Sequence, residues 1–481
     1  MGYLSFQYAL IVAAAFILYH LTHLQYRWLV LFIASIAFYI VCVKNPIQLV
    51  CFAATIIVAF AGGLIIERCK INKGIARSVY LASIVLVLIP LFASKLLVST
   101  HLAGSFSLVV PVGVSYYTLQ LIAYLSDVYH EKIAASRKFF RFFLFVSFFP
   151  QIIQGPIPRY DQLYPQLIKG HRFDPDDILS GVHMIIWGLF LKTMIADRAG
   201  TVVNNVFDNA PAYLGIYALT AGILYSIQLY ADFQACVKIS QGVSRLFGIK
   251  LIDNFHQPYF SRSIGEFWRR WHISLSTWLR DYVYIPLGGG RKSEFRKDLN
   301  QVIVFLISGI WHMSHILSYQ FLIWGGMHAF YQVVERKTGN FRSRIRKRMK
   351  IEDDSLIHVA VSRVVTCFLV MIAWIMFRAS NALVGVRLIS SIFMTHNPWI
   401  LWDDSLLRLG LTWKEWIILS VSIVIMGIAD ALNERSNAEE WFMKQHCLLR
   451  WVACVFILSL IFVFGSYGHG YNAASFIYGG F

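Results

Sequence analysis

One histidine stands where an apolar part of the chain is interrupted. His312 lies between two apolar segments, 299–312 and 319–334, and basic residues flank the far end of each segment. Two short segments that return to the same side of a membrane place His312 near their turn, at depth. An ionisable side chain inside a membrane segment marks a candidate functional site, and histidine transfers protons near neutral pH. His312 is therefore a candidate general base, with a hydrogen bond between helices as the alternative role.

A second histidine lies in the polar and aromatic segment 264–281, whose spacing predicts one amphipathic helix. Its apolar face carries Trp268, Trp271, Leu275 and Trp278. The adjoining face carries Arg269, His272, Ser276 and Arg280. Tryptophan and arginine on a helix too polar to span are typical of the membrane interface. The glycine-rich run 286–291 follows and can bring backbone close to a ligand. We therefore expect an interfacial helix beside the His312 hairpin.

The composition determines the solvent in which these residues must work. Of 481 residues, 57% are hydrophobic and 14% are charged, whereas soluble domains have roughly 45–50% apolar and about 25% charged residues. The chain is therefore expected to be an all-α polytopic membrane protein with one integral domain, 1–481. Its net charge of +17 first suggests nucleic acid as a partner. Basic loops on the cytoplasmic side of a membrane protein explain the excess better, so no nucleic acid is expected.

Stretches long and apolar enough to enter a bilayer number around a dozen, and several are short. The first is interpreted as a retained helix, because the chain does not begin with the basic region of a signal peptide. Short basic loops at 67–77 and 132–141 predict their own side as cytoplasmic and the N-terminus as external. The stretches are 3–20, 28–43, 46–66, 79–98, 106–126, 139–155, 178–196, 212–231, 299–312, 319–334, 356–377, 413–430 and 448–465.

The interrupted region also carries a family resemblance. The runs 257–259, 263–282 and 286–289, followed by Gly309-Ile310-Trp311-His312, are similar to the signature of the membrane-bound O-acyltransferase family. The similarity is closest to its bacterial polysaccharide O-acetyltransferases of the alginate-acetylase branch, and it is strongest over a catalytic core of about 109–335. The resemblance implies a fold of about 11–13 transmembrane or re-entrant helices around a central tunnel, in a multi-pass protein of the bacterial cytoplasmic (inner) membrane.

The resemblance also implies roles for individual residues. His312 matches the catalytic histidine of the family, and His272 matches a second histidine in the reaction tunnel. Further residues are expected to bind the donor or to line the tunnel, with membrane headgroups as the alternative ligand of the arginines. They are Arg269, Arg270, Ser276, Arg280, Asp281, Trp311, Asp232 and Asn254.

The implied reaction transfers an acetyl group from a cytoplasmic thioester, acetyl-CoA or an acyl-carrier protein, to a hydroxyl reached from the outer side. An extracytoplasmic serine-hydrolase-like acetyltransferase and a polysaccharide are the expected partners, with membrane lipids around the protein. No metal and no tightly bound cofactor is expected. The cluster of basic residues at 336–350 either binds anionic headgroups or is an ordinary cytoplasmic loop, and the second explanation is favoured.

Two positions depart from the family pattern. Met313-Ser314-His315 follows the Trp-His pair where relatives usually have glycine, so Met313 can narrow the passage and His315 is either a third tunnel histidine or a packing residue. Gln234-Ala235-Cys236 replaces the usual Ser-Gly-Tyr. Cys236 is interpreted as a small buried residue in preference to an acyl carrier, because apolar surroundings make a thiol less reactive.

Three other functions compete with acetyl transfer. D-Alanyl transfer from a carrier-protein thioester to teichoic acid is the alternative within the family. A transporter or flippase also has a dozen spans, but it predicts paired half-repeats that the sequence does not show. A structural scaffold explains neither the Trp- and Arg-rich segment nor the histidine hairpin.

Overall fold

The computed structural model describes residues 2–43, 45–99, 111–291, 293–436 and 438–467. The start of the predicted core, 109–110, lies outside these residues, as does the part of the predicted span 106–126 that precedes residue 111. In the described part of the chain the regular structure is helical, and a single isolated bridge joins Phe255 to Trp271. The expected all-α membrane fold is confirmed.

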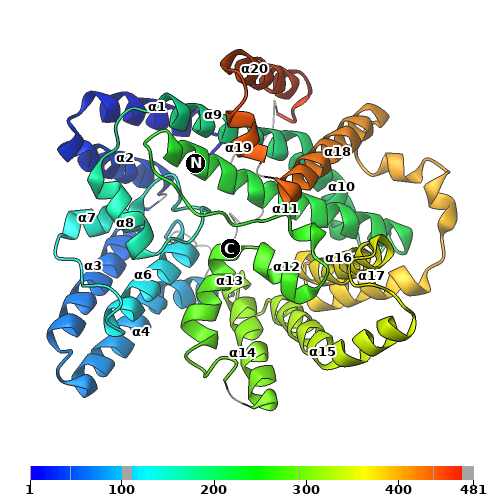
Figure 1. Cartoon of the computed structure of the whole chain (residues 1–481), viewed down its shortest axis with the longest axis horizontal. Helices are drawn as coiled ribbons and strands as arrows, with labels where there is room; N and C mark the ends of the chain where they lie inside the picture. Colours follow the sequence, from blue (N-terminus) through cyan, green and yellow to red (C-terminus); the bar gives the residue numbers. More distant parts are fainter. Residues whose placement is uncertain (1, 44, 100–110, 292, 437, 468–481) are drawn as a thin grey trace.

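The N-terminal helices form one half of the molecule, on the blue and cyan side of Figure 1. Their buried side chains make one hydrophobic core, rich in phenylalanine and tyrosine. The helices are α1 (Phe6–Leu21), α2 (Arg27–Cys42), α3 (Pro46–Arg68), α4 (Lys73–Ser99), α6 (Val114–Tyr129), α7 (Phe139–Ser147) and α8 (Tyr160–Lys169).

A second core lies among the later helices. The long helix α11 crosses the middle of Figure 1 and packs along α9. A π-helical turn, Leu191–Ala196, joins α9 to α10 without a loop. The helices of this half are α9 (Pro175–Phe190), α10 (Asp197–Asp208), α11 (Ile216–Arg245), α16 (Leu356–Arg378), α17 (Ala382–Met394), α18 (Trp413–Arg435), α19 (Ala438–Met443) and α20 (Cys447–Phe464).

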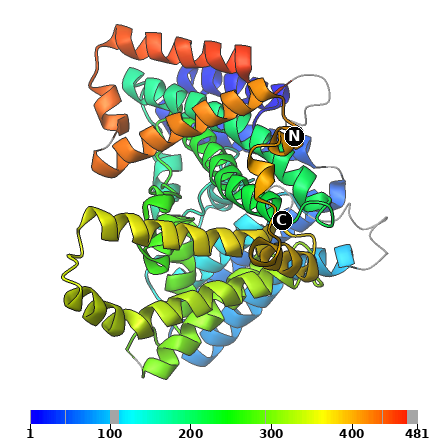
Figure 2. The same cartoon turned by 90° about the vertical axis from the view of Figure 1, so that its right-hand side faces the viewer.

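The segment with the two histidines lies between these halves. It comprises α12 (Ile264–Arg270), α13 (Ile273–Leu279), α14 (Glu294–His312) and α15 (Gln320–Arg348). In Figure 2 the yellow-green helices α14 and α15 lie in the half of the molecule opposite the orange and red helices α18 and α20. The helix α14 ends at His312 and α15 returns beside it, so the predicted hairpin is confirmed.

Seven helical segments in the described residues are long and apolar enough to cross a membrane. The helix α1 and α17 are apolar but shorter. The protein is therefore a multi-pass integral membrane protein. The seven segments are Leu24–Cys42, Pro46–Arg68, Lys73–Leu96, Pro175–Asp208, Leu356–Arg378, Trp413–Arg435 and Cys447–Phe464.

Two predicted elements differ from the structure. The stretch 139–155 contains only the nine residues of α7 and then turns, because Phe148 leaves the helical conformation just before Pro150. The prediction of one continuous helix over 264–281 is wrong. The backbone breaks between Arg270 and Ile273, and both short helices pack inside the protein, with Trp271 1% exposed.

Candidate functional site

The hairpin of α14 and α15 brings two backbones close together beside His312. A Cβ on Gly309 would lie 2.6 Å from the carbonyl oxygen of Phe321, and one on Gly325 would lie 2.5 Å from that of Phe305. Real Cβ atoms do not approach backbone so closely. The two glycines therefore set the spacing of the hairpin and, with it, the position of the residue at the end of α14.

His312 is the last residue of α14 and is 2% exposed. Its ring packs edge-on against three aromatic rings, with centroids 4.6 Å from Trp311, 5.3 Å from Trp324 and 5.2 Å from Phe377. The indole N–H of Trp311 donates to the carbonyl of Ser115 on α6, at 3.1 Å. The imidazole is thus held in an aromatic pocket that is anchored to both halves of the molecule.

His272 occupies the break between α12 and α13. Its backbone is left-handed, with φ 44° and ψ 54°, a conformation uncommon outside glycine. Asn254 stabilises the break, since its carbonyl accepts from the N–H of Ile273 at 2.9 Å and its side-chain oxygen accepts from the N–H of Ser274 at 3.1 Å. The buried His272 ring lies 4.7 Å from Phe233 of α11 and 6.3 Å from Trp311.

The structure therefore brings the two predicted histidines to the same indole. The ring of Trp311 contacts both imidazoles, from elements forty residues apart in the sequence. Asn254, another predicted site residue, accepts hydrogen bonds from the two backbone N–H groups that follow His272. A strained backbone at a buried histidine is a feature of functional sites. The arrangement buries two imidazoles beside one indole, away from bulk water.

A buried lysine, which sequence analysis did not single out, lies at the same place. The ammonium of Lys95, on α4, donates to the carbonyl of Trp311 at 2.8 Å and also to the carbonyl of Met313. The signal was present in the sequence, because Lys95 is an ionisable residue inside the apolar stretch 79–98. Its partners, more than two hundred positions away, were not predictable from that stretch.

Asp232 lies in an ion cluster. Its carboxylate is 2.7 Å from the ammonium of Lys192, which is also 2.8 Å from Asp197. Lys192 and Asp232 are each 2% exposed, and Lys192 lies on the π-helical turn. The cluster ties α11 to the junction of α9 and α10. The next residue, Phe233, contacts His272. The ion pair of Asp232 therefore fixes the part of α11 that packs against His272.

Cys236, one turn beyond Asp232, is buried. Its thiol donates to the side-chain oxygen of Gln154 at 2.8 Å. Of the residues after the Trp-His pair, Met313 is buried and His315 is partly exposed in the turn, where its N–H donates to the hydroxyl of Ser318 at 3.3 Å.

The three arginines do not share one surface. Arg269 and Arg280 are exposed, whereas Arg270 pairs with Glu434 at 2.5 and 3.0 Å and with Glu266 at 2.7 Å. The hydrogen bond to Glu434 raises the pKa of the Arg270 guanidinium. Arg270 therefore joins α12 to α18 and already has its charge neutralised.

The remaining predicted residues make local contacts. Arg280 pairs with Asp281 at 2.8 Å, and Asp281 also pairs with Arg159 at 3.3 Å. The hydroxyl of Ser276 donates to the carbonyl of Trp271 at 3.1 Å. Ser276 thus secures the start of α13 just after His272.

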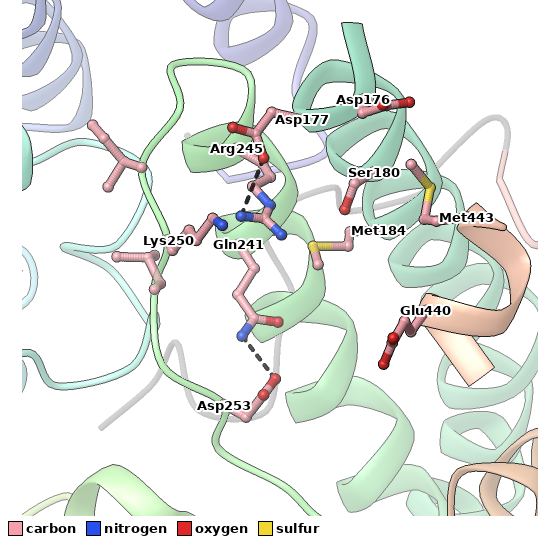
Figure 3. Close-up of a pocket in the computed structure, with 12 residues that line it drawn as sticks. Asp176, Asp177, Ser180, Met184, Gln241, Arg245, Lys250, Asp253, Glu440 and Met443 are labelled. Carbon is pink, nitrogen blue, oxygen red and sulfur yellow. Dashed lines mark hydrogen bonds and ion pairs between the residues drawn. The ribbon is translucent and has the colours of Figure 1, made fainter. Parts of the chain in front are cut away.

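Two neighbouring cavities open beside α9, α11 and α19. Figure 3 shows the one of about 460 Å³, where Arg245 pairs with Asp177 at 3.2 Å and Gln241 donates to Asp253 at 2.9 Å. The other measures about 630 Å³ and includes Phe255 in its wall. The Phe255 ring lies 5.0 Å from that of Phe233, which contacts His272. The rings of Phe255 and Phe233 therefore lie between this cavity and His272.

The chain is similar to known proteins of one family. The model of the membrane-bound O-acyltransferase family matches residues 131–380. The chain is 33% identical over 402 residues to a probable alginate O-acetylase of Pseudomonas aeruginosa, covering 78% of this chain and 71% of that one. A peptidoglycan O-acetyltransferase of Helicobacter pylori is 35% identical, over 57% of this chain and 55% of its own. A teichoic acid D-alanyltransferase of Bacillus subtilis is 30% identical, over 56% and 71%.

Proposed function

Because the chain belongs to the membrane-bound O-acyltransferase family, we propose that it transfers an acetyl group from a cytoplasmic thioester to a hydroxyl on the outer side of the membrane. The chain is an acyltransferase with O-acetyltransferase activity. The donor, the acceptor and the direction across the membrane are the proposal. The bacterial cytoplasmic membrane is the proposed location, with lipids against the apolar outer faces.

One observation carries the proposal: His312 and His272 lie on one buried indole at the end of the α14–α15 hairpin. The two ends of that hairpin that lie away from His312 are basic, with Arg296 and Lys297 on α14 and a run of arginines and lysines near the end of α15. Basic helix ends favour the cytoplasmic side. In this proposal the donor approaches His312 from the cytoplasmic side and the acceptor from the outer side.

In the proposed mechanism His312 acts as the general base. Its imidazole takes the proton of the acceptor hydroxyl as the oxygen attacks the thioester carbonyl. The tetrahedral intermediate collapses, the carbon–sulfur bond breaks, and the leaving thiolate takes the proton back from His312. General-base catalysis contributes about 10²–10⁴-fold in rate. His272 is placed next to the same indole, where it helps to orient the reacting groups.

The donor is proposed to be acetyl-CoA or an acyl-carrier thioester. Arg269 and Arg280 are exposed cations on the segment that carries His272, and they are the candidates to bind donor phosphates. Arg270 is not proposed for this role because two carboxylates already pair with it.

The acceptor is proposed to be a hydroxyl of an exported polysaccharide, or of an extracytoplasmic serine-hydrolase-like protein that passes the acetyl group on. One relative of the chain is named for alginate and another for peptidoglycan. D-Alanyl transfer is the second candidate, favoured by 30% identity to a teichoic acid D-alanyltransferase.

The test uses the full-length protein purified in detergent and supplied with acetyl-CoA labelled in the acetyl group. We expect slow release of labelled acetate by the wild-type protein, and a loss of about 10²–10⁴-fold in His312→Ala. The exposed His23→Ala is the matched control and should keep wild-type release. Equal release by wild type and His312→Ala would contradict the proposal. Release from a D-alanyl carrier thioester, with none from acetyl-CoA, would favour the second candidate.

A further inference from the structure

Lys95 is a buried cation that the acyl-transfer mechanism does not use. It lies on the spanning helix α4 and is 6% exposed. Its ammonium reaches two carbonyl groups of another part of the chain, those of Trp311 and Met313. These two residues stand immediately before and after His312. A single side chain therefore binds the backbone on both sides of the proposed base.

The end of α14 has a need that this ammonium meets. The last carbonyl groups of a helix have no partner within it. The N–H of Met313 reaches the carbonyls of Gly309 at 3.1 Å and Ile310 at 3.3 Å. The Trp311 carbonyl accepts from Lys95 at 2.8 Å. A positive charge at a helix C-terminus also interacts favourably with the helix dipole.

Burial of the Lys95 ammonium is unfavourable unless its hydrogen bonds compensate for the lost hydration. A charged side chain inside a membrane span is unfavourable, and such residues usually have a functional reason. The hairpin is already held by close backbone packing at Gly309 and Gly325, and by the Trp311 indole bonded to Ser115. The contribution specific to Lys95 is to fix the chain where it leaves α14, at the turn that begins with Met313.

We propose that Lys95 is a positioning residue of the acyl-transfer site, which holds the backbone at 311–313 so that the His312 imidazole keeps its orientation toward the acceptor hydroxyl. This inference rests on the proposed function. Lys95 donates to the backbone on both sides of the base. Its loss should therefore slow the chemical step and leave donor binding in place.

The experiment compares Lys95→Met, Lys95→Arg and Lys73→Met in the purified full-length protein, with labelled acetyl-CoA as the donor. Methionine keeps an unbranched side chain that is one atom shorter, and it removes the charge. We expect Lys95→Met to lower kcat about 10²-fold, as misplacement of a reacting group by about 1 Å does. KM for acetyl-CoA should change less than about twofold, because the substitution leaves the contacts with the bound donor in place. Lys95→Arg should recover at least part of kcat, because a guanidinium also donates to two carbonyls. Lys73→Met, at the exposed start of the same helix, should match wild type.

Three outcomes would overturn the inference. Lys95→Met with wild-type kcat would remove the positioning role. A parallel loss of kcat and rise of KM, with no recovery in Lys95→Arg, would mean a general structural role. Failure of Lys95→Met to purify as a folded protein, when Lys95→Arg folds but is as inactive as His312→Ala, would do the same. If His312→Ala itself is fully active, the proposed function fails, and that result is distinct from an active Lys95→Met beside an inactive His312→Ala.

Discussion

Two buried polar regions of this molecule are built in opposite ways. At the π-helical turn, Lys192 is matched by the carboxylates of Asp197 and Asp232, at 2.8 and 2.7 Å. At the end of α14, His312 is enclosed by aromatic rings, and the nearby Lys95 binds neutral carbonyl groups. Mutual neutralisation holds helices together at the first region. The second encloses an imidazole among aromatic rings, the imidazole that we propose as the general base.

The comparison separates stability from activity. Changes at the ion cluster should act first on folding, because removing one partner leaves the remaining buried charges less well compensated. Changes at the α14 end should act first on turnover, because the geometry around His312 depends on close contacts. Three substitutions test this separation, from the largest expected effect to the smallest.

The largest effect is expected for Asp232→Asn. It keeps the shape of the side chain and removes one of the two carboxylate charges that pair with Lys192. The cost should be about 3 kcal/mol of stability, at the low end for breaking a buried ion pair, because Asp197 still pairs with Lys192. The measurement is the thermal unfolding midpoint in detergent, with turnover per folded molecule measured at a lower temperature. Asp354→Asn, in an exposed ion pair with Arg262, is the control and should unfold as wild type does. Unchanged stability together with lost turnover would place Asp232 in the reaction and break the comparison.

An intermediate effect is expected for Gly309→Ala. The added methyl group would lie 2.6 Å from the carbonyl oxygen of Phe321, so α14 must move away from α15. Overpacking costs about 1–3 kcal/mol, and the shift should lower kcat more than it lowers the unfolding midpoint. Gly326→Ala adds the same methyl group on the same hairpin with nothing within 4 Å, and it should retain wild-type turnover. Equal activity of the two variants would show that the close approach is dispensable.

The smallest effect on stability is expected for Asn254→Ala. It removes the acceptor of the Ser274 N–H beside His272, which should cost about 1 kcal/mol. Turnover should fall because the left-handed break at His272 loses a hydrogen bond. Asn254→Asp keeps a side-chain oxygen acceptor and should retain more activity than the alanine variant. The same loss in both would indicate that the amide nitrogen, and not the oxygen, is what the site needs.

The sequence predicted the larger features well and the long-range contacts poorly. The membrane class, the hairpin, the buried His312 and the family resemblance all came from local patterns: apolar stretches, a break between them and a run of matched residues. The prediction of one helix over 264–281 was wrong because helical periodicity continues through His272, while the backbone is turned there by Asn254 and by the bridge between Phe255 and Trp271. The length of α7 was overestimated because the apolar pattern continues past Phe148, where the backbone leaves the helical conformation.

The amino-acid sequence by itself determined that this protein lies in a membrane and that His312 stands where apolar segments break, because hydrophobic burial and helix length depend on neighbouring residues. Tertiary structure alone decided which polar groups meet. It placed Lys95 against the carbonyls around His312. It also paired Asp232 with Lys192 and Arg270 with Glu434. Those contacts join residues 40 to 218 positions apart, and no local pattern encodes the packing that brings them together.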